Sequence, residues 1–332
     1  MTRFHKGFTL VELLLVTTII GILTGITVTV TRQVYHTSRV AKTDATLQKL
    51  DRVILEMYAE YENRRVPSPN FGNSPVAAQV TQAARLWFLR DMIRMEMPSS
   101  SAEVKRYHSI PNNNDDKLGP ALFRFRIDNN NGNIVTARAE DSPLRRLYES
   151  TLQSCNGNYE SAKCLFLIVM YGNPEARELF FDSEIATDDD GLSYFVDGWG
   201  NPIYFLRWAP GLALSERQPS TDAAKAASPD PLDPTEVGGM INLAESNPEK
   251  NIWLIDIYTN PATAPQVHHG WTLLPVILSS GGVRENDFDA SFGIILRPEE
   301  GAIPVVDPFK WQLGTYSDQP NYAVIHNHSS RR

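Results

Sequence analysis

An apolar run near the N-terminus constrains this 332-residue chain more than any other feature. The run extends from Phe8 to Val30, and Glu12 is its only ionisable residue. As a helix it would be about 35 Å long, which is enough to cross the hydrocarbon core of a bilayer. Two basic residues, Arg3 and Lys6, precede the run, and the positive-inside rule predicts that they stay in the cytoplasm. We therefore expect the rest of the chain to face the periplasm or the exterior.

Other interpretations of this run explain less of it. A secretory signal has a shorter apolar core and a small-residue cleavage site, and no such site follows Val30. A buried core helix is disfavoured by the length of the run. A plain membrane anchor fits the length, but it explains neither Glu12 nor the junction between Gly7 and Phe8.

The basic leader continues into a specific motif, Gly7-Phe8-Thr9-Leu10-Val11-Glu12-Leu13. This segment resembles the prepilin cleavage and methylation motif shared by type IV pilins and the pseudopilins of type II secretion. The resemblance covers about residues 1–35. It implies that a prepilin peptidase cleaves between Gly7 and Phe8 and that the new amine of Phe8 is N-methylated.

Glu12 has a physical role that fits this resemblance. A carboxylate in hydrocarbon is costly and usually has a partner. Cleavage before Phe8 creates a positive amine about one helical turn away. In a filament, that amine can pair with Glu12 of a neighbouring subunit, which neutralises both charges and fixes the axial register. The competing interpretation is that Glu12 snorkels at the membrane edge without a partner.

The helix is expected to continue beyond the membrane. Residues 31–61 contain neither Pro nor Gly, and apolar side chains recur there at three- and four-residue steps: Val40, Leu47, Leu50, Ile54, Met57, Tyr58 and Tyr61. The stripe is too irregular for a coiled coil, so we expect it to dock on the globular head. The predicted organisation is a leader at 1–7, a transmembrane and filament-core helix at 8–30, its amphipathic continuation at 31–63 and a periplasmic head with insertions at 64–332.

Within the head, periodicity predicts a helix at 76–97 and mainly helical structure at 142–182, with a loop at 98–120 between them. Cys155 and Cys164 lie in an interruption of the second helical region, and an oxidising exterior would join them in a disulfide. The polar segment 215–239 is expected to be an insertion or exposed loop. Strands are predicted at 202–208, 252–258 and 273–278. The predicted fold is α+β and pilin-like: a long N-terminal helix packed on a head with a small antiparallel sheet and extra helices.

Two segments of the head resemble major pseudopilins. Residues Asp197-Gly198-Trp199-Gly200-Asn201-Pro202-Ile203-Tyr204 are similar to their Asp-Pro-Trp-Gly-Asn-Pro-Tyr segment, a turn that leads into a strand. The match departs at Gly198, where the family usually has Pro. Residues 274–282 are similar to the family's later strand, which ends in a Ser-x-Gly turn.

In major pseudopilins the later turn leads to a calcium-binding acidic loop. The matching acidic residues here are Glu285, Asp287 and Asp289, so calcium is the single cofactor that the sequence suggests. A second acidic cluster spans 188–190, and a solvated acidic loop is the competing interpretation of both. Zinc is disfavoured, because His268 and His269 are adjacent and because His326 and His328 lie near a terminus where disorder is the default.

No catalytic signature is present, so we do not expect an enzyme. Loss of the leader removes Arg3 and Lys6, which leaves 29 basic against 39 acidic residues and a net charge of −10. This balance argues against nucleic acid as a partner. The predicted function is a structural subunit of a type II secretion-like pseudopilus, with its partners a prepilin peptidase/methyltransferase, other pseudopilin subunits and copies of itself, an inner-membrane assembly platform and membrane lipid. The alternatives are a type IV pilin for adhesion, motility or DNA uptake, and a membrane-tethered binding domain that uses a pilin leader.

Overall fold

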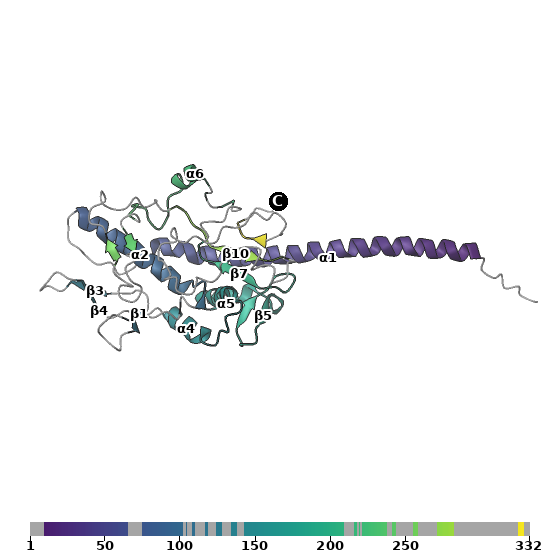
Figure 1. Ribbon diagram of the computed structural model, residues 1–332, viewed down its shortest axis with the longest axis horizontal. Helices are drawn as coiled ribbons and strands as arrows, with labels where there is room; N and C mark the ends of the chain where they lie inside the picture. The colour runs from purple at the N-terminus through teal and green to yellow at the C-terminus, as the bar shows by residue number, and fades with distance from the viewer. Residues whose placement is uncertain are drawn as a thin grey trace, which may run out of the picture.

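The structure is a computed structural model. Its described residues form one long helix and a head. It describes residues 10–65, 75–101, 104, 108–109, 117–118, 124–127, 134–137, 143–208, 216–217, 219, 221–237, 241–243, 255–257, 271–281 and 325–328. Figure 1 shows the head gathered around one end of helix α1, while the other end projects far beyond it. This arrangement confirms the predicted α+β, pilin-like fold.

The long helix forms as predicted. Helix α1 spans Leu10–Glu60, and a 3-10 turn, η1, continues it through Tyr61–Asn63. Side chains up to residue 39 are exposed wherever they are described, and burial begins at Val40 and Thr43. Beyond that point the predicted stripe faces the head, because Leu50 and Ile54 are completely buried. The prediction that the second half docks on the head is confirmed.

The other helices lie where periodicity placed them. Helix α2 spans Pro75–Glu96, and the second helical region contains α4 (Pro143–Leu152), α5 (Glu160–Leu167) and a π-helical turn, η2 (Ile168–Gly172). Two 3-10 turns follow, η3 (Pro174–Leu179) and η4 (Asp182–Glu184), and a short helix, α6, spans Asp222–Ala226. Residues 153–159 form the expected interruption between α4 and α5, but it contains only Cys155, since Cys164 lies in α5 and not in the interruption as predicted.

A three-stranded antiparallel sheet, in the order β11-β10-β7, joins distant parts of the chain. Its strands are β7 (Ile203–Leu206), β10 (Val276–Ser279) and β11 (Ile325–His326). Four antiparallel hairpins accompany it: β1 (His108–Ser109) with β2 (Lys117–Leu118), β3 (Arg124–Ile127) with β4 (Ile134–Ala137), β5 (Ile185–Thr187) with β6 (Ser193–Phe195), and β8 (Ile241–Leu243) with β9 (Ile255–Ile257). Strands β7, β9 and β10 fall within or overlap the three predicted strand segments.

The main hydrophobic core lies between α1, α2, the α5–η2 region and the central sheet. Leu50 and Ile54 of α1, Leu89 of α2, Ile168 of η2 and Phe205 of β7 are all fully buried in it. At about 25 cal/mol per Å² of buried apolar surface, such side chains dominate the attachment of α1 to the head.

Parts of two polar segments are more buried than the sequence suggests. The segment 215–239 is not simply exposed, since Leu232 and Val237 belong to the main core and a buried ion pair of 2.7 Å joins Asp230 to Arg90. The C-terminal histidines are also ordered: β11 carries His326, and the His328 side chain is fully buried. In both segments the buried polar groups have partners that are distant in the sequence, as a buried charge or polar group requires. Local composition does not reveal such partners.

Candidate functional site

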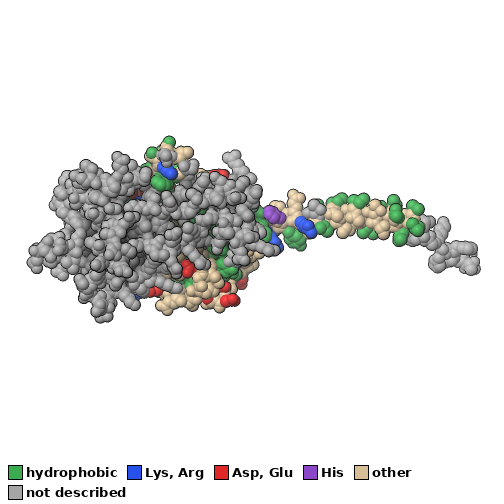
Figure 2. All heavy atoms as spheres, viewed as in Figure 1, with side chains coloured by type: hydrophobic (Ala, Val, Ile, Leu, Met, Phe, Trp, Pro, Cys, Tyr) green, Lys and Arg blue, Asp and Glu red, His purple; other side chains and the backbone are tan. Residues whose placement is uncertain are grey.

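The exposed half of α1 is the first part of the candidate assembly site. Its apolar side chains have nothing to pack on, with exposed fractions such as 80% for Leu10 and 59% for Leu23. Within the described residues, the helix formed by α1 and η1, Leu10–Asn63, is the one that is long and apolar enough to cross a membrane. Figure 2 shows green apolar side chains along much of this projecting segment.

The threonine hydroxyls in this segment are compatible with an apolar surrounding. The hydroxyls of Thr18, Thr24 and Thr27 donate to the carbonyl four residues earlier, at 2.7–2.8 Å. A polar group that is satisfied within its own helix costs little in hydrocarbon. Glu12 lies in the first turn of α1, and its side chain is exposed. Gly7 and Phe8 lie outside the described residues.

The second part of the site is the junction where a turn of the head packs on α1. The backbone N–H of Gly198 donates a 2.9 Å hydrogen bond to Thr43 Oγ1. A Cβ at Gly198 would overlap the backbone carbonyl of Arg39. Close packing of the turn on α1 thus explains the departure from the family pattern, because Pro has no N–H to donate and adds side-chain atoms where the helix backbone lies.

Asp197 organises this turn from within the head. Its Oδ1 accepts hydrogen bonds from the N–H groups of Trp199 and Asn201, at 2.8 and 2.9 Å. Its Oδ2 accepts one from Ser279 Oγ, at 2.7 Å. Asn201 Nδ2 in turn donates to the Gly281 carbonyl, at 3.1 Å. The two segments that resemble major pseudopilins therefore meet around one buried carboxyl, whose pKa is raised by burial.

A second polar contact lies farther along α1, at Glu184 of η4. Lys49 approaches its Oε2 to 2.8 Å, and Thr46 Oγ1 donates to its Oε1 at 2.6 Å. Burial acts to raise the pKa of Glu184, but the hydrogen bonds from Lys49, the Phe181 N–H and Thr46 outweigh it and lower the pKa below its ordinary value. The ionised carboxylate therefore fixes η4 against the helix.

The C-terminal segment makes a third contact with α1, through Asp51. Asn327 Nδ2 donates to Asp51 Oδ1 at 2.8 Å, and Arg217 pairs with Asp51 Oδ2 at 2.7 Å. Asn327 also accepts from the Ile277 N–H at 2.9 Å. Sequence reasoning missed these contacts, although polar residues on the buried face of α1 were a usable signal, since buried polar groups nearly always have partners.

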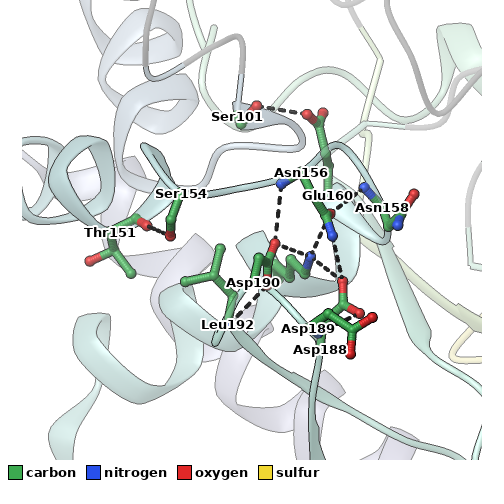
Figure 3. A network of polar contacts seen from close by, with 11 residues as sticks. Ser101, Thr151, Ser154, Asn156, Asn158, Glu160, Asp188, Asp189, Asp190 and Leu192 are labelled. Atoms are coloured by element: carbon green, nitrogen blue, oxygen red, sulfur yellow. Dashed lines mark hydrogen bonds and ion pairs between the residues drawn. The ribbon is translucent and has the colours of Figure 1, made fainter.

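The acidic cluster at 188–190 is occupied by a lysine, not arranged around an empty site. Lys163 Nζ lies 2.7 Å from Asp188 Oδ2, 2.6 Å from Asp190 Oδ2 and 3.2 Å from Asn156 Oδ1. Figure 3 shows these oxygens converging. Hydrogen bonds from Lys163 lower the pKa of Asp188, and they likewise outweigh burial at Asp190, whose pKa is also lowered. An ammonium group thus supplies the positive charge that a calcium ion would have supplied.

The structure shows Cys155 and Cys164 as separate thiols, and the disulfide expected in an oxidising exterior stays a prediction. Cys164 is buried in a small apolar cluster with Tyr148 and Leu152, and Cys155 packs at the edge of the same cluster. Burial raises the pKa of the Cys155 thiol. Both residues therefore serve as small apolar side chains.

The calcium prediction at Glu285, Asp287 and Asp289 falls outside the described residues, as do His268 and His269, and it stays a prediction. Among the residues that the structure does describe, no group of three or more His, Cys, Asp or Glu side chains is placed to hold a metal ion.

Comparison with known families decides how the N-terminus is interpreted. The family model for the prokaryotic N-terminal methylation motif matches residues 2–28. The chain carries a prepilin-type leader. This match covers the predicted cleavage junction and much of the exposed, apolar part of α1. Searches of the curated proteins and of the solved structures found no match to the chain. This leader is of the kind that pilin-like proteins carry, and it is consistent with anchoring in the inner membrane.

Proposed function

We propose that this chain is a non-enzymatic structural subunit of a type II secretion-like pseudopilus. The observation that carries the proposal is the exposed apolar half of α1 directly behind a prepilin leader. Such a surface needs lipid or other helices around it, and a filament subunit uses the two in turn. The helix would lie in the inner membrane before assembly and in the filament core afterwards, with residues 64–332 as the periplasmic head.

The choice of a pseudopilus over another filament rests on the head. The turn at Asp197–Tyr204 and the strand and turn around Ser279 resemble major pseudopilins, and a buried hydrogen bond joins them at 2.7 Å. A shared sequence pattern that is also a joined structural unit is stronger support than either segment alone. The acidic net charge of the mature chain offers no comparable support for DNA uptake.

Processing is the first step of this function and can be measured directly. We propose that the prepilin peptidase cleaves between Gly7 and Phe8, so the mature chain begins with N-methylated Phe8. Intact-mass analysis of membrane-extracted protein, with and without the peptidase, should show the loss of residues 1–7 and the gain of one methyl group. A chain that still begins at Met1 when the peptidase is active would contradict the proposal.

Deleting the gene in its native host separates the candidate machines. A pseudopilus subunit should be needed for protein secretion, with little effect on twitching motility, adhesion or DNA uptake. Normal secretion together with loss of one of the other activities would favour a type IV pilin. Normal behaviour in all four assays, with a head that still captures a ligand, would favour a tethered binding domain.

A further inference from the structure

The part of α1 between the apolar run and the head has an unusual charge pattern. From Leu13 to Thr43 the chain contains no Asp or Glu, although the mature chain as a whole is acidic. The fixed charges in that interval are all positive: Arg32, Arg39 and Lys42. Figure 2 shows basic side chains and a histidine where α1 leaves the head. The positive charge is therefore concentrated where the helix meets the boundary of the bilayer.

Two of these residues, Arg32 and Arg39, lie on the face of α1 against which the Trp199 turn packs. Arg32, His36 and Arg39 are spaced by four and three residues, so they line one side of α1. The ring of Trp199 packs edge-on against His36, with 5.6 Å between ring centroids. Arg32 and Arg39 are exposed, one on each side of that pair along the helix. Lys42 is directed elsewhere, since its Nζ donates to the Ser183 carbonyl at 3.0 Å.

The height of this group matches the polar layer of a membrane. His36 lies six residues beyond Val30, which corresponds to about 9 Å along the helix. The headgroup layer on each side of a bilayer is about 5–7 Å thick, and a typical helix tilt of about 20° changes the height by less than about 1 Å, so the group lies at the outer edge of this layer. Arginine side chains reach toward phosphate groups along such boundaries, and tryptophan favours the same depth.

We infer that Arg32, Arg39 and Trp199 form a membrane-docking collar that binds anionic phosphate headgroups in the leaflet on the side of the head. The basic side chains supply charge complementarity, and the half-buried indole supplies an amphipathic contact at the same level. The collar holds the unassembled subunit with its head close to the bilayer. The inference rests on the proposed function only in taking α1 to span the membrane, and it does not require assembly.

The test uses the full chain in nanodiscs, one copy in each. The discs contain phosphatidylethanolamine with either phosphatidylglycerol or phosphatidylcholine, and some of the lipid is brominated high on the acyl chains to quench nearby tryptophan. The fluorescence of Trp199 is the difference between the unsubstituted chain and Trp199→Phe. We expect this difference to be quenched in anionic discs and to recover in phosphatidylcholine discs or at high salt, where the net negative charge of the headgroups is absent or screened.

Arg32→Gln/Arg39→Gln should abolish the anionic-lipid dependence, because two basic residues near such a surface change the ratio of docked to undocked chains by about 30-fold. The matched control is Arg52→Gln/Arg146→Gln, which removes the same charge from two exposed sites on α1 and α4 and should leave the quenching unchanged. Equal quenching in both lipids would overturn the inference, because helix length alone would then set the depth of Trp199. An unquenched Trp199 in the anionic discs would also overturn the inference, because the indole would then not lie at the level of the headgroups. A failed assembly test with a normal result here would count against the pseudopilus and not against the collar.

Discussion

The backbone N–H of Gly198 donates a hydrogen bond to Thr43 Oγ1, 2.9 Å away, and so fastens a turn of the head directly to α1. The contact joins residues that are 155 positions apart in the chain. It lies within three residues of Val40, where burial of the helix begins. The orientation of the head relative to the exposed apolar half of α1 therefore depends on this junction, with further support from Glu184 and Asp51.

Substitution of Gly198 should loosen the junction. Gly198→Ala places a Cβ against the Arg39 carbonyl, and the resulting overpacking should lower the free energy of unfolding by about 1–3 kcal/mol. Gly198→Pro, the residue usual in the family, should cost more because it also removes the donor to Thr43. Urea denaturation of the detergent-solubilised chain measures both. Gly21→Ala is the control, since its added Cβ meets nothing within 4 Å; equal stability of all the variants would contradict the close packing.

Lys163 should be needed to neutralise the acidic loop. Lys163→Met leaves Asp188 and Asp190 without their cation, and losing hydrogen bonds to charged groups at such a partly buried site typically costs about 1.5–3 kcal/mol. The triple variant Lys163→Met/Asp188→Asn/Asp190→Asn removes the stranded charges as well and should recover much of the loss. Both are compared by urea denaturation. If the triple variant is as unstable as the single one, packing of the lysine stem, and not charge, explains the effect.

The sequence predicts the helices well for a simple physical reason. Periodicity is a local signal, so α1 and α2 are evident from the spacing of their own apolar residues. The contacts that complete the head are not local. Arg90 pairs with Asp230 across 140 residues, and Asn327 reaches Asp51 across 276. No local pattern could show that Asp230 and Leu232 of the polar segment, or His328 near the C-terminus, are buried.

The candidate site shows the same division. The junction between Gly7 and Phe8, together with Glu12, forms a short motif that can be recognised without a structure. The role of Thr43, by contrast, depends on a turn far along the chain that happens to cross it. The spacing of Cys155 and Cys164 likewise says nothing about how their side chains pack, and the structure places both in or against one apolar cluster.

Stability should fall in mild acid because of His328. Its Nε2 donates to the Pro275 carbonyl at 3.0 Å, and burial lowers the pKa of His328 from 6.5 to about 4. Between these values the unfolded chain binds a proton that the folded chain does not. The contribution of neutral, buried His328 to the free energy of unfolding is therefore complete above pH 6.5. It declines by up to about 3 kcal/mol as the pH falls toward 4.

Urea midpoints between pH 7 and 4 measure this effect. His328→Gln keeps a side-chain donor but cannot titrate, so its stability should decline less steeply than that of the unsubstituted chain. His36→Gln removes an exposed histidine instead and serves as the control. Parallel pH profiles for all three chains would show that other groups cause the acid sensitivity.

The assembly mechanism depends on Glu12. Cleavage before Phe8 brings a positive amine into the apolar filament core, and we propose that Glu12 of a neighbouring subunit receives it. Glu12→Ala should still insert in the membrane, because the apolar run becomes longer. It should still be cleaved if the peptidase recognises mainly the leader and Gly7. Assembly should fail or become weak, because the amine in the filament has no counter-charge and the pair that fixes the axial register is gone.

The unsubstituted chain and Glu12→Ala are compared by their cross-linked multimers and by secretion activity. The mass of the mature product shows whether both chains are processed. Glu62→Ala is a matched control, because it removes a carboxylate from an exposed position at the far end of the same helix. A plain anchor predicts the reverse outcome, in which Glu12→Ala is silent or improves insertion. Normal multimers from a processed Glu12→Ala chain would mean that α1 is only a tether. A partial loss would instead favour a position at the filament tip, because a tip subunit has neighbours on one side alone and needs the register signal less.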